Sequence, residues 1–343
     1  MRWIYGVTLV ALVACKGGGS GGADGDVAGD DDDDVVHSTL PWSQVTDTQQ
    51  DCCSTVKVDF QWTESRLETT KAQWAMPPDP IGAVVVFHGS NGSIAAVQQI
   101  EWLELYNVLY DRGIGVMLLN SVDRGDGGGK AQWSELPGPD NPDVDEVDIL
   151  LATVADESDF EFEDPVVTIG YSNGAKFSLL CSGAAYDRGR NIRGAVMHNG
   201  GNGFPDHGLP GLWVSAENDS SGGGADNMQS LAERQGNGSL HLAGDEIPLH
   251  PARFAKQPQF DEEESIQLFD LLVEDRGWVD AAGNRLIQFE GDPDEFVDDL
   301  ENQIPVNNKI EAAYQLRVVW ALHRMSAQHK LAEAAWIEEQ LLR

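Results

Sequence analysis

The chain has 343 residues, and its 57 acidic side chains outnumber 22 basic ones, which gives a formal net charge of −35. A surface of this sign argues against nucleic acids and anionic membrane surfaces as partners, because both are bound through basic patches. The length allows one large domain or two small ones. After residue 14, no apolar run is long enough to cross a membrane.

The N-terminus predicts export. One charged residue, Arg2, is followed by an apolar run at 3–14 that is too short to span a bilayer, so 1–14 have the layout of a signal peptide. The run ends in Leu-Val-Ala-Cys and resembles the lipobox of bacterial lipoproteins. The resemblance implies that Cys15 is acylated. By the same resemblance, lysine rather than aspartate at position 16 implies that the protein is anchored in the outer membrane. The alternative is a plain signal peptide followed by a chance cysteine.

Residues 15–50 are predicted to be a tether between a lipid anchor and a folded domain. They are rich in glycine, and five consecutive aspartates, Asp30–Asp34, repel one another, so the segment cannot form a core. A calcium site at Asp24, Asp26 and Asp30 is the alternative, but no EF-hand spacing completes it. We therefore predict no metal site.

The remainder, 51–343, is predicted to be one α/β domain. Two alternating polar and apolar segments come first, as in half-buried antiparallel edge strands, and continuous apolar runs typical of buried parallel strands follow. Strands are expected at 54–62, 69–76, 83–89, 114–120, 166–170, 194–200, 211–217 and 238–244, and helices at 93–111 and 143–155. Buried strands that alternate with helices predict a mostly parallel, doubly wound sheet.

A serine stands between two glycines where the third buried run gives way to a helical pattern. The stretch is Gly-Tyr-Ser-Asn-Gly, with Ser172 at its centre. A Gly-x-Ser-x-Gly turn between a strand and a helix can hold a nucleophilic serine above the carboxyl ends of the strands. An ordinary glycine-rich turn is the alternative. The position after a buried strand and before a helix favours the nucleophile.

A nucleophilic serine of this kind needs hydrogen-bond donors for a developing oxyanion. One expected donor is the backbone N–H of Asn173, directly after the serine, and the other is Ser90, in the loop 88–93 that follows the first buried strand. His88 begins that loop. We interpret His88 as a residue that holds the loop rather than as a catalytic base.

The acid and the base should follow the serine in the chain. Asp219, just beyond the strand at 211–217, is the preferred acid, and Glu217 is the alternative. Two histidines remain as bases. His250 closely follows the last predicted strand, whereas His323 is followed by a single helical stretch. We favour His323, which makes 245–322 a helical insertion; with His250 as the base, the region after it would be a helical appendage.

The other histidines are less suitable. His37 lies in the tether and His88 in the loop 88–93, and His329 is expected inside the final helix. His198 and His207 lie near the strand at 194–200. His241 falls within the strand at 238–244, where its ring would sit in the sheet.

Four segments resemble α/β-hydrolases of the polyhydroxybutyrate-depolymerase and feruloyl-esterase-like type. They are VVVFHGSNG (84–92), the tryptophan-containing loop KAQWSELPGPDNPDVDEVDILLATV (130–154), IGYSNGAKFSLL (169–180) and the loop after LWVSAEND (212–219). The resemblance covers residues 83 to about 245. The sequence departs from the family pattern after its last predicted strand, where the family has a histidine within a short distance.

The resemblance implies that a small-molecule or polymeric ester is hydrolysed through an acyl-enzyme at Ser172, without a cofactor. Two alternatives stay open. The first is a non-catalytic surface lipoprotein that binds a partner or glycan, and the second is a serine peptidase or amidase on the same fold. The presence of a histidine that can reach Ser172 would distinguish the enzymes from the binding protein.

Two further predictions concern cysteines and tryptophans. Export to an oxidising compartment permits one disulfide, between Cys181 and either Cys52 or Cys53. Helices are expected at 264–274, at 294–304 and along 309–343. The three tryptophans of this region are expected in a core rather than in an acyl pocket; they are Trp278, Trp320 and Trp336.

Overall fold

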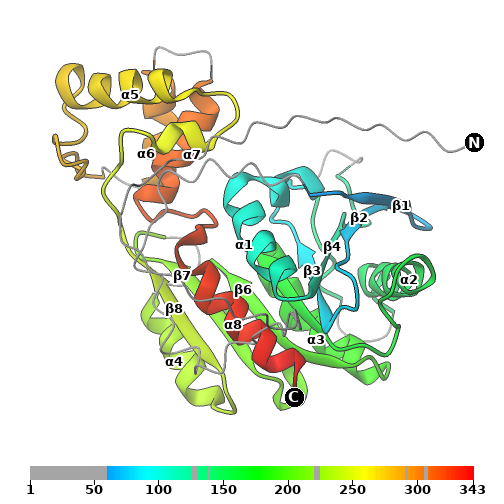
Figure 1. Ribbon diagram of the computed structural model, residues 1–343. Coiled ribbons are helices and arrows are strands. Elements are labelled where there is room, and N and C mark those ends of the chain that lie inside the picture. The colour runs from blue at the N-terminus through cyan, green and yellow to red at the C-terminus, as the bar shows by residue number, and fades with distance from the viewer. Residues whose placement is uncertain (1–59, 126–129, 137–139, 220–224, 290–292, 305–307) are drawn as a thin grey trace, which may run out of the picture. The chain divides into compact units, whose positions relative to one another are not determined.

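An eight-stranded sheet organises the part of the chain that the computed structural model describes, which is residues 60–125, 130–136, 140–219, 225–289, 293–304 and 308–343 (Figure 1). The strand order is β1-β2-β4-β3-β5-β6-β7-β8. The strands are β1 Thr63–Arg66, β2 Lys71–Ala75, β3 Gly82–Phe87, β4 Ile114–Leu119, β5 Val166–Tyr171, β6 Ile192–His198, β7 Gly211–Ala216 and β8 Leu240–Gly244. β2 is antiparallel to both its neighbours, and all other neighbouring strands are parallel. The predicted α/β class and the edge position of the opening strands are confirmed.

Helices cover both faces of the sheet. On one face lie α1 (Ile100–Asp111) and α8 (Lys330–Leu341); on the other lie α2 (Pro142–Glu157), α3 (Asn173–Asp187) and α4 (Ala225–Gln235). The alternation of side chains along a strand produces this division. In β3, Val84 and Val86 pack towards α1 and α8, whereas Val85 and Phe87 pack towards α2 and α3. Each such buried side chain contributes about 1.5–3 kcal/mol.

The start of α2 holds an acidic residue in a fixed place. The side chain of Asn141 accepts a hydrogen bond from the backbone N–H of Asp143 at 2.9 Å, and Pro142 occupies the first helical position. Asparagine is a favoured N-cap, and proline fits the first turn because its missing N–H has no intrahelical partner there. The cap keeps the Asp143 side chain at the buried end of the helix.

Two predicted elements near the N-terminus need correction. Of the predicted strand at 54–62, residues 54–59 lie outside the described part of the chain, and 60–62 are not in a strand; β1 starts at Thr63. Phe60 and Trp62 instead stack on each other and pack against the ring of Tyr106. The predicted helix at 93–111 is a 3-10 helix, η2 (Ile94–Gln98), followed by α1.

The helical region predicted along 309–343 is two helices, and a single helix follows His323 as predicted. Helix α7 (Lys309–Val319) ends, and α8 begins only after the 3-10 turn η6 (Ala327–His329). Ala321 takes a left-handed conformation, with φ 50°, which no helix interior accepts. His329 is therefore the N-cap of α8 rather than an interior residue, and His323 lies in the loop between the helices.

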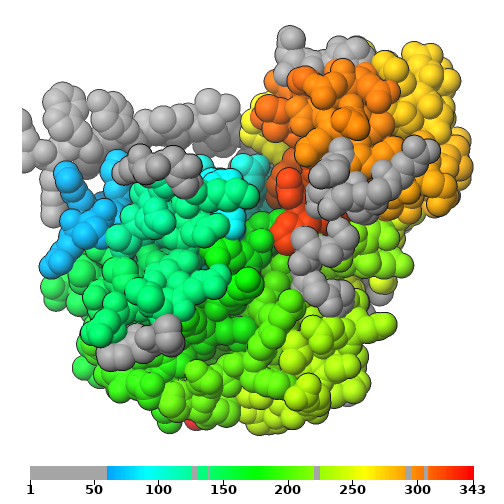
Figure 2. Space-filling model, turned by 180° about the vertical axis from the view of Figure 1, so that it is seen from behind, coloured from blue at the N-terminus to red at the C-terminus, as the bar shows by residue number. Residues whose placement is uncertain are grey.

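The segment between β8 and this loop builds a separate core. It contains η4 (Arg253–Lys256), α5 (Glu262–Asp270), the π-helical turn η5 (Leu271–Asp275), α6 (Pro293–Glu301) and α7. Its apolar residues form one cluster that includes Trp278 and Trp320, and its yellow and orange atoms form one contiguous body (Figure 2). Trp336 packs in the core beneath the sheet. All three tryptophans are at most 6% exposed, so the predicted core placement is confirmed.

Cys181 lies on α3 with its side chain fully buried, and burial raises the pKa of its thiol far above the usual range. It forms no disulfide with another described residue. Cys52 and Cys53, the predicted partners, lie outside the described residues, as do Cys15 and His37. Among the helices that the structure describes, none is both long enough and apolar enough to cross a bilayer.

Candidate active site

Ser172 occupies a strained turn between β5 and α3. Its backbone angles are φ 55° and ψ −114°, a combination that non-glycine residues rarely adopt. The two flanking glycines permit the turn. A Cβ on Gly170 would lie 1.9 Å from the carbonyl oxygen of Gly174, and a Cβ on Gly174 would lie 2.4 Å from that of Phe87. Strain of this kind persists where surrounding structure enforces it, and it is concentrated at functional sites.

The loop after β3 lies directly against this serine. A Cβ placed on Gly89 would lie 3.4 Å from the Cβ of Ser172. The loop closes through a hydrogen bond from the Gly92 N–H to the Gly89 carbonyl, at 3.0 Å, and Ser90 is exposed at its tip. Asn173 is the first residue of α3, where backbone N–H groups have no intrahelical acceptor. The structure thus brings the segments of Ser90, Ser172 and Asn173 together.

His88 holds the loop from beneath. Its Nε2 accepts hydrogen bonds from the Ser121 N–H at 3.2 Å and from the Arg124 guanidinium at 3.1 Å. The proton must therefore be on Nδ1, which donates to the Gly89 carbonyl at 2.8 Å. Arg124 also donates to the Gly92 carbonyl at 2.8 Å. Both ring nitrogens are occupied, which confirms the interpretation of His88 as a loop-holding residue.

Acid should destabilise the protein through His88. Burial, supported by the nearby Arg124 charge, lowers the pKa of this ring to about 4. The unfolded chain binds a proton near pH 6.5, whereas the folded protein does not until about pH 4, so folding loses up to about 3 kcal/mol as the pH falls through this window. Chemical denaturation at pH 7 and pH 4 measures how much the free energy of unfolding falls in acid, and the fall should be smaller in His88→Gln than in the parent. An equal fall in both proteins would contradict the conclusion that the His88 ring is neutral in the folded protein.

Trp133 connects the loop after β3 to the start of α3. Its indole N–H donates to the His88 carbonyl at 2.7 Å, and its backbone N–H donates to the Asn173 side-chain oxygen at 3.0 Å. Asp143 fixes this tryptophan segment, because its carboxylate accepts from the N–H groups of Val122 and Ser134, each at 2.6 Å. Burial raises the pKa of Asp143, and these two donors oppose the rise. The tryptophan and its aspartate thus set where Asn173 and the loop stand.

The predicted acid and one predicted base meet. The His323 Nδ1 lies 2.8 Å from Asp219 Oδ2, and Asp219 is only 8% exposed. His323 also lies beside the serine turn, because its ring centroid is 5.1 Å from that of Tyr171, the residue before Ser172. His250 lies elsewhere, exposed just before η4, where its Nδ1 accepts from the Ala252 N–H at 3.1 Å. Glu217, the alternative acid, accepts a hydrogen bond from the Glu246 N–H.

The remaining described histidines have other partners. His198, the last residue of β6, pairs with Glu333 of α8 at 2.8 Å, and both side chains are buried. His241 lies in β8 as predicted, with its Nε2 2.8 Å from the Ser215 hydroxyl. His207 contacts Asp187 at 3.1 Å. In the part of the chain that the structure describes, no three histidine, cysteine or acidic residues are placed to hold a metal ion.

A pocket of about 360 Å³ opens on the edge of the sheet where β4 ends. Most of its lining residues are of polar types and come from β1, β2, η2 and the residue after β4: Glu64, Arg66, Lys71, Gln73, Gln98 and Asn120. Ser93, at the end of the loop after β3, also lines it. The pocket therefore opens at the edge of the sheet where the parallel strands end, the edge that also carries Ser172.

The strand order, the two helical layers and the serine turn at the carboxyl end of β5 together define the fold. The chain has the α/β-hydrolase fold. No family model matches the sequence, and no curated protein matches it. The structure is similar to solved structures at low identity, and these similarities are too distant to support an argument about activity.

Three such solved structures illustrate the range. An esterase from Pyrobaculum calidifontis is 15% identical, with a TM-score of 0.41 over 64% of this chain and 87% of its own. An esterase/lipase from an uncultured bacterium is 15% identical, with a TM-score of 0.40 over 61% and 82%. A serine hydrolase without a lid, XC6422 from Xanthomonas campestris, is 14% identical, with a TM-score of 0.38 over 54% and 84%.

Sequence reasoning missed several residues that build the site. Arg124 belongs to a glycine-rich stretch without a recognisable motif, and nothing in its neighbourhood signals a contact with His88. Tyr171 occupies the variable position between Gly170 and Ser172, and no sequence pattern there signals a contact with His323. Asp143 had one usable signal, because it follows an Asn-Pro helix start, where an acidic residue is common. Its role as an acceptor for two loops depends on tertiary contacts.

Proposed function

We propose that this protein is a serine hydrolase that cleaves carboxylic esters through an acyl-enzyme on Ser172. The observation that carries the proposal is the 2.8 Å contact between His323 Nδ1 and Asp219, beside the strained turn that presents the serine. A base oriented by a carboxylate beside a serine on such a turn is the arrangement that activates a serine nucleophile.

The chemistry follows from these positions. The Ser172 hydroxyl attacks the ester carbonyl carbon, while His323 Nε2 takes its proton and Asp219 accepts the Nδ1–H, which stabilises the imidazolium. The Asn173 and Ser90 N–H groups stabilise the negative oxygen of the tetrahedral intermediate. His323 then protonates the departing alcohol. A water molecule, deprotonated by the same histidine, then attacks the acyl carbon; the bond to the Ser172 oxygen breaks, the histidine returns the proton to that oxygen, and the acid leaves.

The substrate is proposed to be a small-molecule or polymeric ester. Parts of a larger substrate that lie far from the cleaved bond have room in the polar pocket beside Asn120 and Gln98. Its amide and charged lining favours polar groups over long alkyl chains. Cleavage of peptides or amides by the same residues is the second candidate, and a panel of matched ester and amide substrates separates the two.

A fluorophosphonate probe tests the proposal directly, because it reacts only with an activated serine. We expect one probe to attach per protein molecule, at the tryptic peptide that contains Ser172, and labelling to require native protein. Heat-denatured protein is the matched control. Native protein that stays unlabelled and hydrolyses no ester would favour a non-catalytic lipoprotein that binds a partner or glycan.

We also propose that the protein is exported and anchored through acylated Cys15. The support is the Leu-Val-Ala-Cys sequence after the apolar run and the acidic, glycine-rich segment behind it. One acyl chain anchors a protein only marginally, whereas two or more give stable attachment. In a bacterial host, Cys15→Ser should abolish palmitate labelling and move the protein from the membrane to the soluble fraction. Persistent labelling of that variant would contradict the anchor.

A further inference from the structure

The loop that carries His323 has no regular secondary structure, yet much of its backbone is held by hydrogen bonds. Between α7 and η6, the carbonyl oxygens of residues 320–324 all accept hydrogen bonds. The Leu322 carbonyl accepts locally, from the Arg324 N–H at 2.6 Å. The other four carbonyls each accept from a residue far away in the sequence. A loop with such anchors has few alternative conformations.

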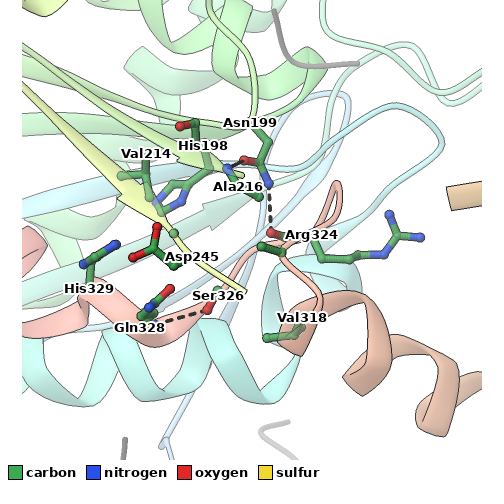
Figure 3. Close-up of a pocket in the computed structure, with 13 residues that line it drawn as sticks. His198, Asn199, Val214, Ala216, Asp245, Val318, Arg324, Ser326, Gln328 and His329 are labelled. Atoms are coloured by element: carbon green, nitrogen blue, oxygen red, sulfur yellow. Dashed lines mark hydrogen bonds between the residues drawn. The ribbon is translucent and has the colours of Figure 1, made fainter. Parts of the chain in front are cut away.

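The distant donors all lie where neighbouring parallel strands end. Tyr171, the last residue of β5, donates its hydroxyl to the His323 carbonyl at 2.6 Å. Asn199, directly after β6, donates its side-chain amide to the Arg324 carbonyl at 2.8 Å (Figure 3). Asn218, shortly after β7, donates its amide to the Trp320 carbonyl at 2.8 Å and its backbone N–H to the Ala321 carbonyl at 2.9 Å.

We propose that Tyr171, Asn199 and Asn218 are positioning residues that hold the imidazole of His323 in register with Ser172 and Asp219. The proposal rests on the proposed function, in which His323 is the base. The three donors come from the ends of β5, β6 and β7, the strands that also present Ser172 and Asp219. The nucleophile, the acid and the anchors of the base therefore share one rigid sheet edge.

The geometry at Asn199 suits this role. Its backbone has φ 48°, a left-handed conformation that asparagine tolerates better than most residues. Its side-chain oxygen accepts from the Ala216 N–H at 2.9 Å, which fixes the amide so that its NH₂ must face the Arg324 carbonyl (Figure 3). One side chain thus ties the end of β7 to the loop.

A small cavity separates the loop from the ends of β6 and β7. Its lining includes Asn199, Ala216, Ala321 and Arg324, and its volume is about 20 Å³ (Figure 3). That is room for roughly one water molecule. If the Asn199 amide were removed, a water molecule could take its place beside the Arg324 carbonyl, but water does not fix a direction.

Tyr171 acts in two ways. Its ring is tilted by 40° against the His323 ring at a centroid distance of 5.1 Å, and its hydroxyl holds the carbonyl of the same residue. The Arg324 guanidinium is a second donor to that carbonyl. Removing only the tyrosine hydroxyl should therefore loosen the loop without detaching it.

The test combines kinetics with hydrogen exchange. Tyr171→Phe keeps the ring and removes the hydroxyl, and Asn199→Gly removes the amide while tolerating the left-handed backbone. Tyr186→Phe is the matched control, because Tyr186 is 46% exposed on α3 and stacks on His207. For a short-chain aryl ester we expect kcat to fall about tenfold or more in the first two variants, with KM within about twofold of the parent. Amide exchange in peptides that cover 320–327 should accelerate in both and stay unchanged in the control.

The two readouts separate the possible failures. A parent without turnover would overturn the proposed function, and hydrogen exchange alone would then decide whether Tyr171 and Asn199 hold the loop. Parent-like exchange in 320–327 for both variants would overturn the positioning role. So would a kcat loss that appears only together with a fall in melting temperature, because that pattern belongs to general destabilisation.

Discussion

Replacing Ser172 with alanine is expected to lower kcat for short-chain aryl esters by at least about three orders of magnitude. The nucleophile and its base act as a unit, so loss of the hydroxyl leaves only the contribution of the oxyanion donors and of substrate binding. The fold should be unaffected, because the strained backbone at Ser172 is imposed by Gly170, Gly174 and the adjoining strands. Initial rates measured over a range of ester concentrations test the expectation.

The matched control for this variant is Ser182→Ala. Ser182 lies on α3 with its side chain buried, and its hydroxyl donates to the Leu179 carbonyl within the helix. The Ser182→Ala substitution also removes a serine hydroxyl, but from inside α3 and away from the turn that holds Ser172, so turnover should stay like that of the parent. Equal activity in Ser172→Ala and the parent, with both folded, would place the reaction on another residue.

The central sheet was predictable because its sequence signal is local. Val84, Val85 and Val86 belong to a run with no polar residue, and such a run can only be a strand covered on both faces or a short buried helix. The glycines at positions 170 and 174 then indicated that the third buried run, at 166–170, is followed by a tight turn and a helix. Strand ends from β3 to β8 fall within about two residues of the predicted positions.

The break between α7 and α8 was not predictable in the same way. Residues 309–343 contain no proline and no glycine, and their apolar spacing stays helical throughout. The break is imposed from outside, by hydrogen bonds from Asn199, Asn218 and Tyr171 to carbonyls that a helix would otherwise use. Such long-range contacts override local propensity, and no pattern within the segment reveals them.

The same limit applies to the candidate site. Ser172 and the loop at 88–93 follow from motifs, and Asp219 follows from its place after a strand. The choice between His250 and His323 depended on which histidine a helical segment of about 80 residues would deliver to the sheet edge. The buried Glu101 shows how that segment is held: it binds Arg253 of η4 at 2.8 Å and the Ala327 N–H of η6 at 2.9 Å.

The base is tested by a pair of alanine substitutions. His323→Ala is expected to reduce kcat by about as much as Ser172→Ala, because either loss removes the activated nucleophile. His250→Ala should change kcat only slightly, since His250 is exposed just before η4 and Asp219 contacts His323. Parallel measurements of kcat and of fluorophosphonate labelling rate check both variants. The opposite ranking would move the base to His250.

Asp219→Asn completes the argument, because it changes the tautomer of His323 rather than removing a group. In the parent, the Asp219 carboxylate accepts a hydrogen bond from the Nδ1–H of His323 at 2.8 Å, which leaves Nε2 as the nitrogen that takes the serine proton. An asparagine amide can instead donate to Nδ1, which places the ring proton on Nε2 and blocks the base. We expect kcat to fall by about 10⁴-fold with KM little changed. Turnover within tenfold of the parent would mean that the 2.8 Å contact serves only to hold the loop.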